Sequence, residues 1–220
     1  MSNYPNTYLV AEDLSEDDEK RLLSQSEIAL DTETLGLDPI RDALCLVQIC
    51  DSHGIVNLVK SHNWPNAVRL KSVLTSPVTK VIHYAIYDCS MILMNIGVEV
   101  VHPYCTRFAS KIARTYGSNH SLAGLVKELV SVDLPKEAQT SDWTGQLTNE
   151  QLEYATNDVR YLLEVKHKLE EKLANRRLMH SGWSYKELNR HCQEMIPALV
   201  QLRLNGWTPE GIGTAAFFGH

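Results

Sequence analysis

Two acidic residues that could hold a divalent cation stand at the end of a short apolar run. Asp31 and Glu33 follow the run Ile28-Ala29-Leu30, which predicts a buried strand over residues 28–32. Because a strand points alternate side chains to the same face, both carboxylates are expected to lie together. Carboxylates held so close repel each other and are partly desolvated, which is unfavourable unless a cation lies between them. Oxygen ligands suit a hard ion such as Mg²⁺ or Mn²⁺.

The pair alone does not establish a metal site. The sequence has 27 acidic residues among 220, so about three acid-x-acid pairs are expected by chance. Asp17 and Glu19 form such a pair with no strand before them. A solvated strand end explains Asp31 and Glu33 equally well, and the metal interpretation depends on carboxylates from elsewhere in the chain.

Two later helices supply such carboxylates. Asp88 lies at the start of a predicted helix over 86–96, and sites in α/β sheets gather where strands end, although capping of the helix N-terminus is an alternative. Tyr154 and Asp158, four residues apart on a predicted helix over 149–174, share one face beside an apolar stripe. A solvated helix surface is the alternative for this second pair.

Taken together, these motifs resemble the DEDD exonucleases of the tyrosine subgroup, and within that superfamily the chain looks like ribonuclease D. The resemblance covers about residues 25–172 and keeps the order of the motifs. The segments that carry it are 28–34, 44–49, 81–88, 141–143 and 152–162.

The resemblance implies a ribonuclease H-like fold and removal of nucleotides from a 3′ end as nucleoside 5′-monophosphates. It implies that Asp31, Glu33 and Asp158 hold a first Mg²⁺ or Mn²⁺ ion. Asp31 would bridge to a second ion, with Asp88 helping through water. Glu33 would also contact the terminal 3′-hydroxyl. Two such ions suit in-line hydrolysis of a phosphodiester.

Further residues are expected to serve the substrate. A phenol with a pKa of about 10 is a poor base at neutral pH, so Tyr154 is expected to orient the attacking water. Thr34, Leu37 and His83 are predicted to bind substrate. Leu37 would contact the last base or else pack in the core, and His83 would contact the substrate backbone or simply be packed.

Three basic residues fall on one face of the helix predicted near 105–116. Arg107, Lys111 and Arg114 are expected to form a solvated face, with a phosphate track toward the site as the alternative. Trp143 is expected to be a buried anchor, with base stacking as its alternative.

The order of predicted elements indicates an α/β fold with a mixed β-sheet flanked by helices. Strands one to three are expected to form an antiparallel meander. Residues 1–175 would form the exonuclease domain, and 176–220 a helical extension packed on it, its last helix ending at Gly206. The strands are expected over 28–32, 44–50, 55–59, 78–83 and 98–101, and the other helices over 15–26, 64–74 and 121–131.

Composition narrows the class of protein. The net charge of −6 argues against a protein that coats long nucleic acids. Five scattered cysteines favour a reduced, cytoplasmic protein, and neither a membrane span nor a signal peptide is evident. No obligate protein partner is evident. The expected substrate is the single-stranded 3′ end of RNA, in RNA processing. A DNA exonuclease and an inactive nucleic-acid-binding domain are the alternatives.

Overall fold

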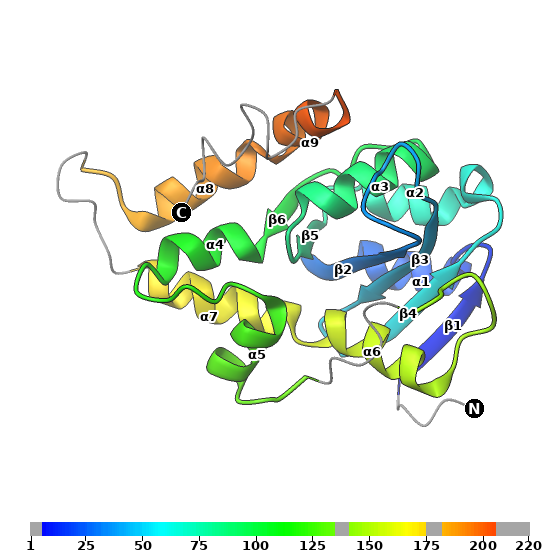
Figure 1. Ribbon diagram of the computed structural model, residues 1–220, viewed down its shortest axis with the longest axis horizontal. Helices are drawn as coiled ribbons and strands as arrows, with labels where there is room; N and C mark the ends of the chain where they lie inside the picture. Colours follow the sequence, from blue (N-terminus) through cyan, green and yellow to red (C-terminus); the bar gives the residue numbers. More distant parts are fainter. Residues whose placement is uncertain (1–5, 135–140, 175–181, 206–220) are drawn as a thin grey trace.

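The computed structural model describes residues 6–134, 141–174 and 182–205 (Figure 1). Within these ranges, six strands form one mixed sheet in the order β1-β4-β3-β2-β5-β6, which confirms the predicted α/β fold class. The strands are β1 (Thr7–Ala11), β2 (Glu27–Thr34), β3 (Leu44–Cys50), β4 (Val56–Lys60), β5 (Thr79–Ile82) and β6 (Pro103–Cys105). The helices are α1 (Glu16–Leu23), η1 (Trp64–Asn66), α2 (Val68–Thr75), α3 (Ile86–Ile96), α4 (Thr106–Ala113), α5 (Leu122–Val130), α6 (Asn149–Arg160), α7 (Leu162–Ala174), α8 (Tyr185–Glu194) and α9 (Ile196–Leu204).

The centre of the sheet is the predicted antiparallel meander of β2, β3 and β4. The turn between β3 and β4 is closed by Asp51, whose Oδ1 accepts hydrogen bonds from the amides of His53 and Ile55. Gly54 has a φ of +76° there, a conformation that glycine adopts without strain. β1, which the sequence did not predict, pairs in parallel with β4 at the edge.

The strands β2 and β5 separate before β2 ends. They pair in parallel only where residues 27–29 face residues 79–81, and β2 continues to Thr34 while β5 stops at Ile82. The far half of β2 therefore has no strand on its β5 side. α3 starts at Ile86, shortly after β5 ends, so its first turn reaches this opening. Openings at the carboxyl ends of strands are where α/β proteins place their sites.

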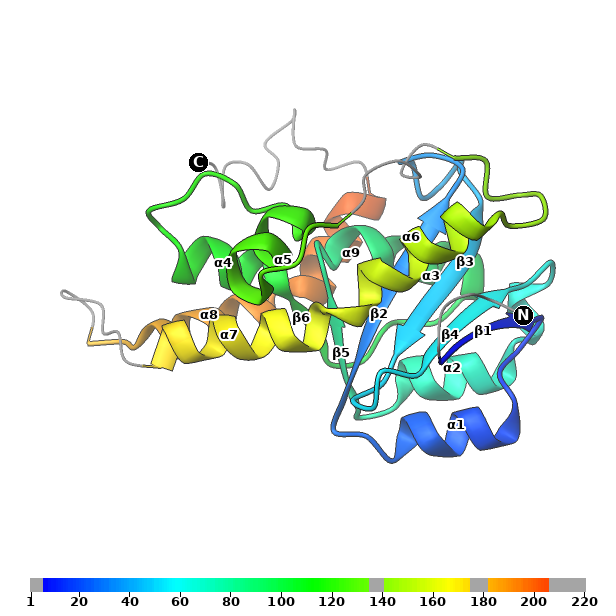
Figure 2. The ribbon, with the colours of Figure 1, turned by 90° about the horizontal axis from the view of Figure 1, so that it is seen from below.

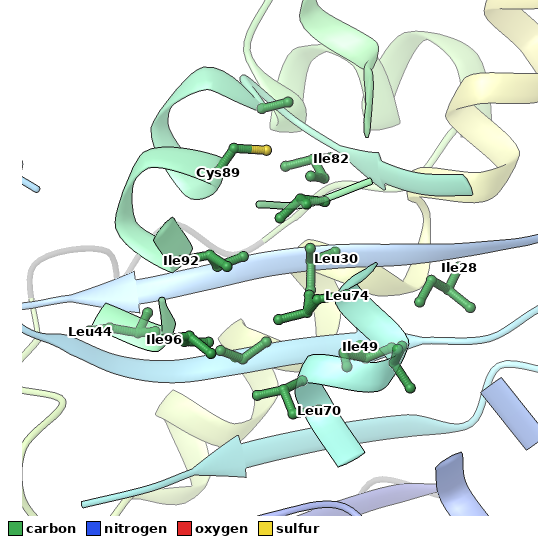
Figure 3. Close-up of a cluster of buried hydrophobic side chains, with 14 of the residues drawn as sticks. Ile28, Leu30, Leu44, Ile49, Leu70, Leu74, Ile82, Cys89, Ile92 and Ile96 are labelled. Atoms are coloured by element: carbon green, nitrogen blue, oxygen red, sulfur yellow. The ribbon is translucent and has the colours of Figure 1, made fainter. Parts of the chain in front are cut away.

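Two apolar cores lie on opposite faces of the sheet, and β2 contributes to both. Ile28 and Leu30 join residues of α2 and α3 in one core (Figure 3). Residues of α9 belong to the same core. Ala29, between them, joins residues of α6 and α7 in the other. Figure 2 shows α6 crossing one face of the sheet with α3 behind it. This alternation along β2 decides which side chains reach which helix layer.

The helix predicted over 149–174 is two helices. α6 ends at Arg160 and α7 starts at Leu162, and Tyr161 between them has φ −103° and ψ −4°. The sequence has no glycine or proline near Tyr161, and the helical spacing of apolar residues continues through the break. α6 packs on the central strands and α7 packs on α4, β2 and β5, so the change in packing partners accompanies a break without a sequence signal.

Two other predicted elements need correction. The strand predicted over 98–101 does not form, since the amide of Val101 donates to the Leu74 carbonyl on α2 and not to a strand. β6 starts instead at Pro103, which faces Lys80 of β5. The helix predicted over 64–74 begins as the separate 3-10 turn η1, where Trp64 donates its ring N–H to the Leu44 carbonyl. α2 follows and runs to Thr75.

The C-terminal helices pack on the rest of the molecule. α8 starts at a capping box of Ser184 and Glu187 and contacts α4 and α7. α9 buries Ile196, Leu199 and Val200 in the core that also contains α3. α9 ends at Leu204, and the helix end predicted at Gly206 lies outside the described residues. In the part of the chain that the structure describes, none of the helices is both long and apolar enough to cross a bilayer.

Candidate active site

The alternation of β2 separates its carboxylates from its hydroxyls. Asp31 and Glu33 follow Ala29 on the face covered by α6, whereas Thr32 follows Ile28 and Leu30 on the face covered by α3. The register shifts between Glu33 and Thr34, at the end of pairing with β3. Both carboxylates therefore lie where the strand is rigidly paired on one side and open on the other.

α6 brings the third carboxylate. A capping box of Thr148 and Gln151 starts the helix, and Ala155 and Val159 are its buried apolar face on the sheet. Asp158, beside that face, places a carboxylate oxygen near Asp31 and Glu33. One oxygen from each of these three residues lies within 4.8 Å of the others.

Asp88 approaches from the opposite layer, in the first turn of α3. Its side chain is buried, and its Oδ1 accepts a hydrogen bond of 2.7 Å from the Thr32 hydroxyl. Asp88 is not one of the three residues whose oxygens meet within 4.8 Å, but its charge acts on both Asp31 and Glu33. Residues from β2, α3 and α6 thus face one another across the open end of β2.

Burial makes all four carboxyl groups hard to ionise, and neighbouring carboxylates add to this for Asp31, Glu33 and Asp88. Burial, followed by the charges of Asp88, Asp158 and Glu33, raises the pKa of Asp31 well above its usual range. Burial with the charges of Asp158 and Asp88 raises the pKa of Glu33 to about 9. Burial likewise raises the pKa values of Asp88 and Asp158 to about 7 each. Since such a cluster is costly as four anions, it favours a cation at its centre.

The chemistry of the donor set fits a hard divalent cation. Carboxylate oxygens are the ligands that Mg²⁺ and Mn²⁺ prefer, and no histidine or cysteine joins the group within the described residues. Gln48 on β3 donates its amide to Glu33 over 3.1 Å, which holds the glutamate from the side. The Gln48 Oε1 atom is buried and has no partner among the described residues.

Tyr154 lies one helical turn before Asp158 and hydrogen-bonds with it. Burial and the charges of Asp158, Glu33 and Asp31 raise the pKa of the Tyr154 phenol, so it stays protonated at neutral pH. Its ring lies 6.2 Å from the ring of Trp143, which is a buried anchor as predicted. Lys60 Nζ donates to the carbonyls of Trp143 (2.9 Å), Thr144 (3.0 Å) and Gly145, which fixes the segment that supports Tyr154.

The residues predicted to bind substrate, Thr34, Leu37 and His83, have different environments in the structure. Leu37 is 76% exposed, which excludes the alternative of a core leucine. Thr34 donates its hydroxyl to the Gly36 carbonyl and contacts the Tyr87 hydroxyl. His83 is hydrogen-bonded through Nδ1 to Thr106, and burial with the nearby Arg107 cation lowers its pKa to about 3, so it is neutral.

The basic face predicted on α4 divides in the structure. Arg114 is buried and pairs with Glu128, so the prediction of a solvated or phosphate-binding side chain is wrong there. Arg107 lies over the ring of Tyr84 at 4.6 Å. Because Arg114 pairs with Glu128, a phosphate track along this helix would not include Arg114.

Sequence reasoning missed three residues that support the site: Gln48, Tyr87 and Arg203. Gln48 lies within a run of buried apolar residues on β3, where an amide is itself a signal, because it needs a partner. Tyr87 adjoins Asp88 and donates its hydroxyl to the Gly36 carbonyl over 2.7 Å. Arg203 lies far away in the sequence and gave no signal.

Comparison with known proteins gives consistent matches over this region. A family model described as 3′–5′ exonuclease matches residues 7–174. Ribonuclease D of Pseudomonas paraeruginosa is 33% identical over 157 residues, which are 69% of this chain and 40% of the relative. The chain spans less than half the length of the curated ribonuclease D relatives that head the matches.

Solved structures match over nearly the whole chain. Brucella melitensis NrnC bound to pGG has a TM-score of 0.82 and 32% identity, over 92% of this chain and 95% of that one. The same protein is similar in its form with bound Mg²⁺, at a TM-score of 0.81 and 32% identity over the same shares. Escherichia coli RNase D, titled an exoribonuclease involved in structured RNA processing, has a TM-score of 0.71 and 25% identity, over 90% and 51%.

Proposed function

Because the chain belongs to the 3′–5′ exonuclease family and resembles ribonuclease D, we propose that it is an exoribonuclease that removes nucleotides from RNA 3′ ends. The observation that carries the proposal is the convergence of Asp31, Glu33 and Asp158 at the open end of β2, with Asp88 in electrostatic reach. The names of the ribonuclease D relatives and the complex of NrnC with pGG support RNA as substrate. The products would be nucleoside 5′-monophosphates.

The carboxylates are proposed to hold two divalent ions, Mg²⁺ or Mn²⁺. Asp31, Glu33 and Asp158 would hold one, Asp31 would also contact the other, and Asp88 would assist from the α3 side. Such a pair of ions, when bound, supplies an activated water and stabilises the leaving oxygen. The Mg²⁺-bound form of the similar NrnC supports this assignment.

The protein's own groups would position the scissile end of the substrate. Glu33, held by Gln48, is proposed to accept the terminal 3′-hydroxyl, which restricts attack to chain ends. Tyr154 keeps its proton and is proposed to orient the attacking water by hydrogen bonding, because its raised pKa makes it a poor base. Its bond to Asp158 and the Trp143 ring fix the phenol in place.

The surrounding residues would bind the last nucleotide. Leu37 is proposed to pack against its base and Thr34 to contact it beside Glu33. His83 is neutral, so it would offer a hydrogen bond rather than an ion pair to the substrate backbone. The net charge of −6 fits a protein that grips a short single-stranded end through ions rather than a long polynucleotide through cations.

Cleavage of 5′-labelled RNA and DNA oligomers tests the proposal. With Mg²⁺ or Mn²⁺ we expect a descending ladder on RNA and none with chelator. A ladder on DNA alone would replace the proposal with a DNA exonuclease, and binding without cleavage would indicate an inactive nucleic-acid-binding domain.

An oligomer with a 3′-phosphate tests the mode of attack. If Glu33 accepts a hydrogen bond from the 3′-hydroxyl, a 3′-phosphate places negative charge next to the Glu33 carboxylate. The repulsion should block release of the last nucleotide. A matched oligomer with the same sequence and a free 3′-hydroxyl is the control. Equal rates on both would contradict the role of Glu33 at the chain end.

A further inference from the structure

The loop between β2 and β3 presents large apolar side chains to solvent at the edge of the site. Leu35, Leu37 and Ile40 are 54%, 76% and 66% exposed, and we call this loop, residues 35–43, the rim loop. Exposed apolar side chains grouped on one short loop are a feature of binding surfaces. A side chain can serve as a contact of fixed position only if its backbone is fixed as well.

The rim loop is closed by its own hydrogen bonds at its base. The amide of Leu35 donates to the carbonyl of Ala43 over 3.0 Å. Asp42 accepts the amide of Asp38 over 2.9 Å, and its own amide donates to the Asp38 carbonyl over 2.7 Å. These bonds close the loop but leave the carbonyls of Gly36 and Leu37 for partners outside it.

Two side chains from the helices behind β2 take these two carbonyls. Tyr87 on α3 donates its hydroxyl to the Gly36 carbonyl over 2.7 Å. Arg203 on α9 donates Nη2 to the Leu37 carbonyl over 2.8 Å. The Arg203 guanidinium also lies 5.5 Å from the centre of the Tyr87 ring. Tyr87 and Arg203 therefore hold adjacent peptide groups of the rim loop and contact each other.

The position of Arg203 is supported by its helix. α9 is anchored on α3 by the buried side chains of Ile196, Leu199 and Val200, so the cation on its last turn is attached to the core. The Nε atom of Arg203 is buried and has no partner among the described residues. Burying an unpaired N–H costs free energy, so stability alone does not account for an arginine here.

We propose that Arg203 is a positioning residue that fixes the Gly36–Leu37 segment, so that α9 takes part in binding the last nucleotide of the substrate. The inference rests on the proposed exonuclease function, in which Leu37 packs against a base. With Arg203 in place, the leucine is presented in one position before substrate arrives. Without it, substrate would have to order the loop on binding, which weakens binding more than the chemical step.

Amide hydrogen exchange tests the structural half of the inference without any need for activity. In R203A we expect exchange in peptides covering residues 35–43 to rise about tenfold, because a hydrogen bond to a charged donor is lost. R190A is the matched control, since Arg190 is exposed on α8 and its partners among the described residues, Glu194 and His191, belong to the same helix. Unchanged exchange in the rim loop of R203A would overturn the inference, whether or not the wild-type protein cleaves RNA.

Steady-state kinetics tests the functional half. R203A is expected to raise KM about tenfold with kcat within about twofold, and R203K to recover part of the loss, because lysine keeps a charged donor but not the planar fork. R203M keeps an apolar stem against Tyr87 and serves as a second variant if R203A does not fold. A fall in kcat with unchanged KM would contradict a positioning role in binding.

A double-mutant cycle separates action through Leu37 from direct contact with RNA. If Arg203 acts through Leu37, R203A should change KM by less than about twofold in an L37A background, although it changes KM about tenfold alone. If Arg203 instead binds a phosphate of the RNA, the effects of R203A and L37A on KM will be additive. R203A will then also reduce the salt dependence of RNA binding. Additive losses would overturn the inference. If the wild-type protein does not cleave RNA, the result counts against the proposed function alone. The hydrogen-exchange measurement still tests whether Arg203 fixes the rim loop.

Discussion

Two parts of the site, which we call the floor and the rim, depart in opposite ways from the usual distribution of charged and apolar residues. The floor consists of Asp31, Glu33, Asp88 and Asp158, four acids on β2, α3 and α6, of which Asp88 is buried and Asp31 and Glu33 are partly exposed. The rim loop holds Leu35, Leu37 and Ile40, three apolar side chains in contact with water. Charges are normally outside and large apolar groups inside.

The two regions differ in the interactions that hold these unfavourably placed side chains in position. The floor is rigid because its residues belong to paired or packed elements, and its cost is electrostatic, visible as raised pKa values. The rim loop belongs to no strand or helix: its own hydrogen bonds close its base, and the side chains of Tyr87 and Arg203 hold the carbonyls of Gly36 and Leu37. The floor is therefore suited to hold ions for chemistry, and the rim to hold substrate, so changes in the first should affect kcat and changes in the second KM.

The largest expected effect follows from removing one charge of the floor. D31N should reduce cleavage about a thousandfold or more, because Asp31 faces both proposed ion positions. The same change removes repulsion from the cluster, so the metal-free variant should melt at the same temperature as the wild type or higher. Cleavage of labelled RNA and thermal melting with chelator check both parts.

Asp17 provides the matched control for this charge change. It belongs to an acid-x-acid pair with Glu19, is exposed, and lies on α1, which packs on α2. D17N alters the net charge equally and should leave cleavage within about twofold. Full activity in D31N, or equal losses in both variants, would show that the carboxylates on β2 are not the site of chemistry.

Removing the phenolic hydroxyl beside the floor should have the next largest effect. Y154F should lower kcat about a hundredfold with little change in KM, since the hydroxyl is proposed to orient water and not to bind RNA. Y8F, which changes an exposed tyrosine on the edge strand β1, is the control. A rise in KM with kcat preserved would assign Tyr154 to substrate binding instead.

The floor should also make stability depend on pH in a predictable direction. Asp88 and Asp158 keep their protons up to a pH of about 7 and Glu33 up to about 9 in the folded protein. In the unfolded chain these groups ionise near pH 4. Folding thus gains from these groups fully below about pH 4, and the gain is lost as the pH rises to about 9.

Thermal melting with and without Mg²⁺ measures this dependence. We expect the metal-free protein to melt at least about 5 °C lower at pH 9 than at pH 5. Mg²⁺ should restore most of the difference at pH 9 and change little at pH 5, because it binds the ionised carboxylates of the native state. A metal effect that is larger at pH 5 would contradict a cation among these acids.

The floor was largely predictable from the sequence, because local periodicity determines it. The two-residue spacing of Asp31 and Glu33 on a strand, and the four-residue spacing of Tyr154 and Asp158 on a helix, each fix a common face. The resemblance to ribonuclease D then indicated that these faces meet. The break at Tyr161 could not be predicted, since the apolar pattern continues through it.

The rim was only half predictable, because its supports come from distant parts of the chain. Leu37 was recognisable as a candidate contact, but its exposure depends on how the loop after β2 folds back. The bond between Arg203 and the Leu37 carbonyl joins residues 166 positions apart and involves a backbone atom, which leaves no trace in residue spacing. Gln48 is similar, since its role depends on the register of β3 against β2.

The smallest expected effect comes from the rim and completes the comparison. L37A should raise KM for RNA about tenfold, with kcat within about twofold, because it removes the proposed apolar contact with the last base, worth about 1–1.5 kcal/mol. It should not lower the melting temperature, since Leu37 is exposed and buries little surface in the fold. L9A, which truncates an exposed leucine on the edge strand β1, should change neither quantity. If L37A instead lowers kcat as Y154F does, the rim takes part in the chemical step and the division between floor and rim fails.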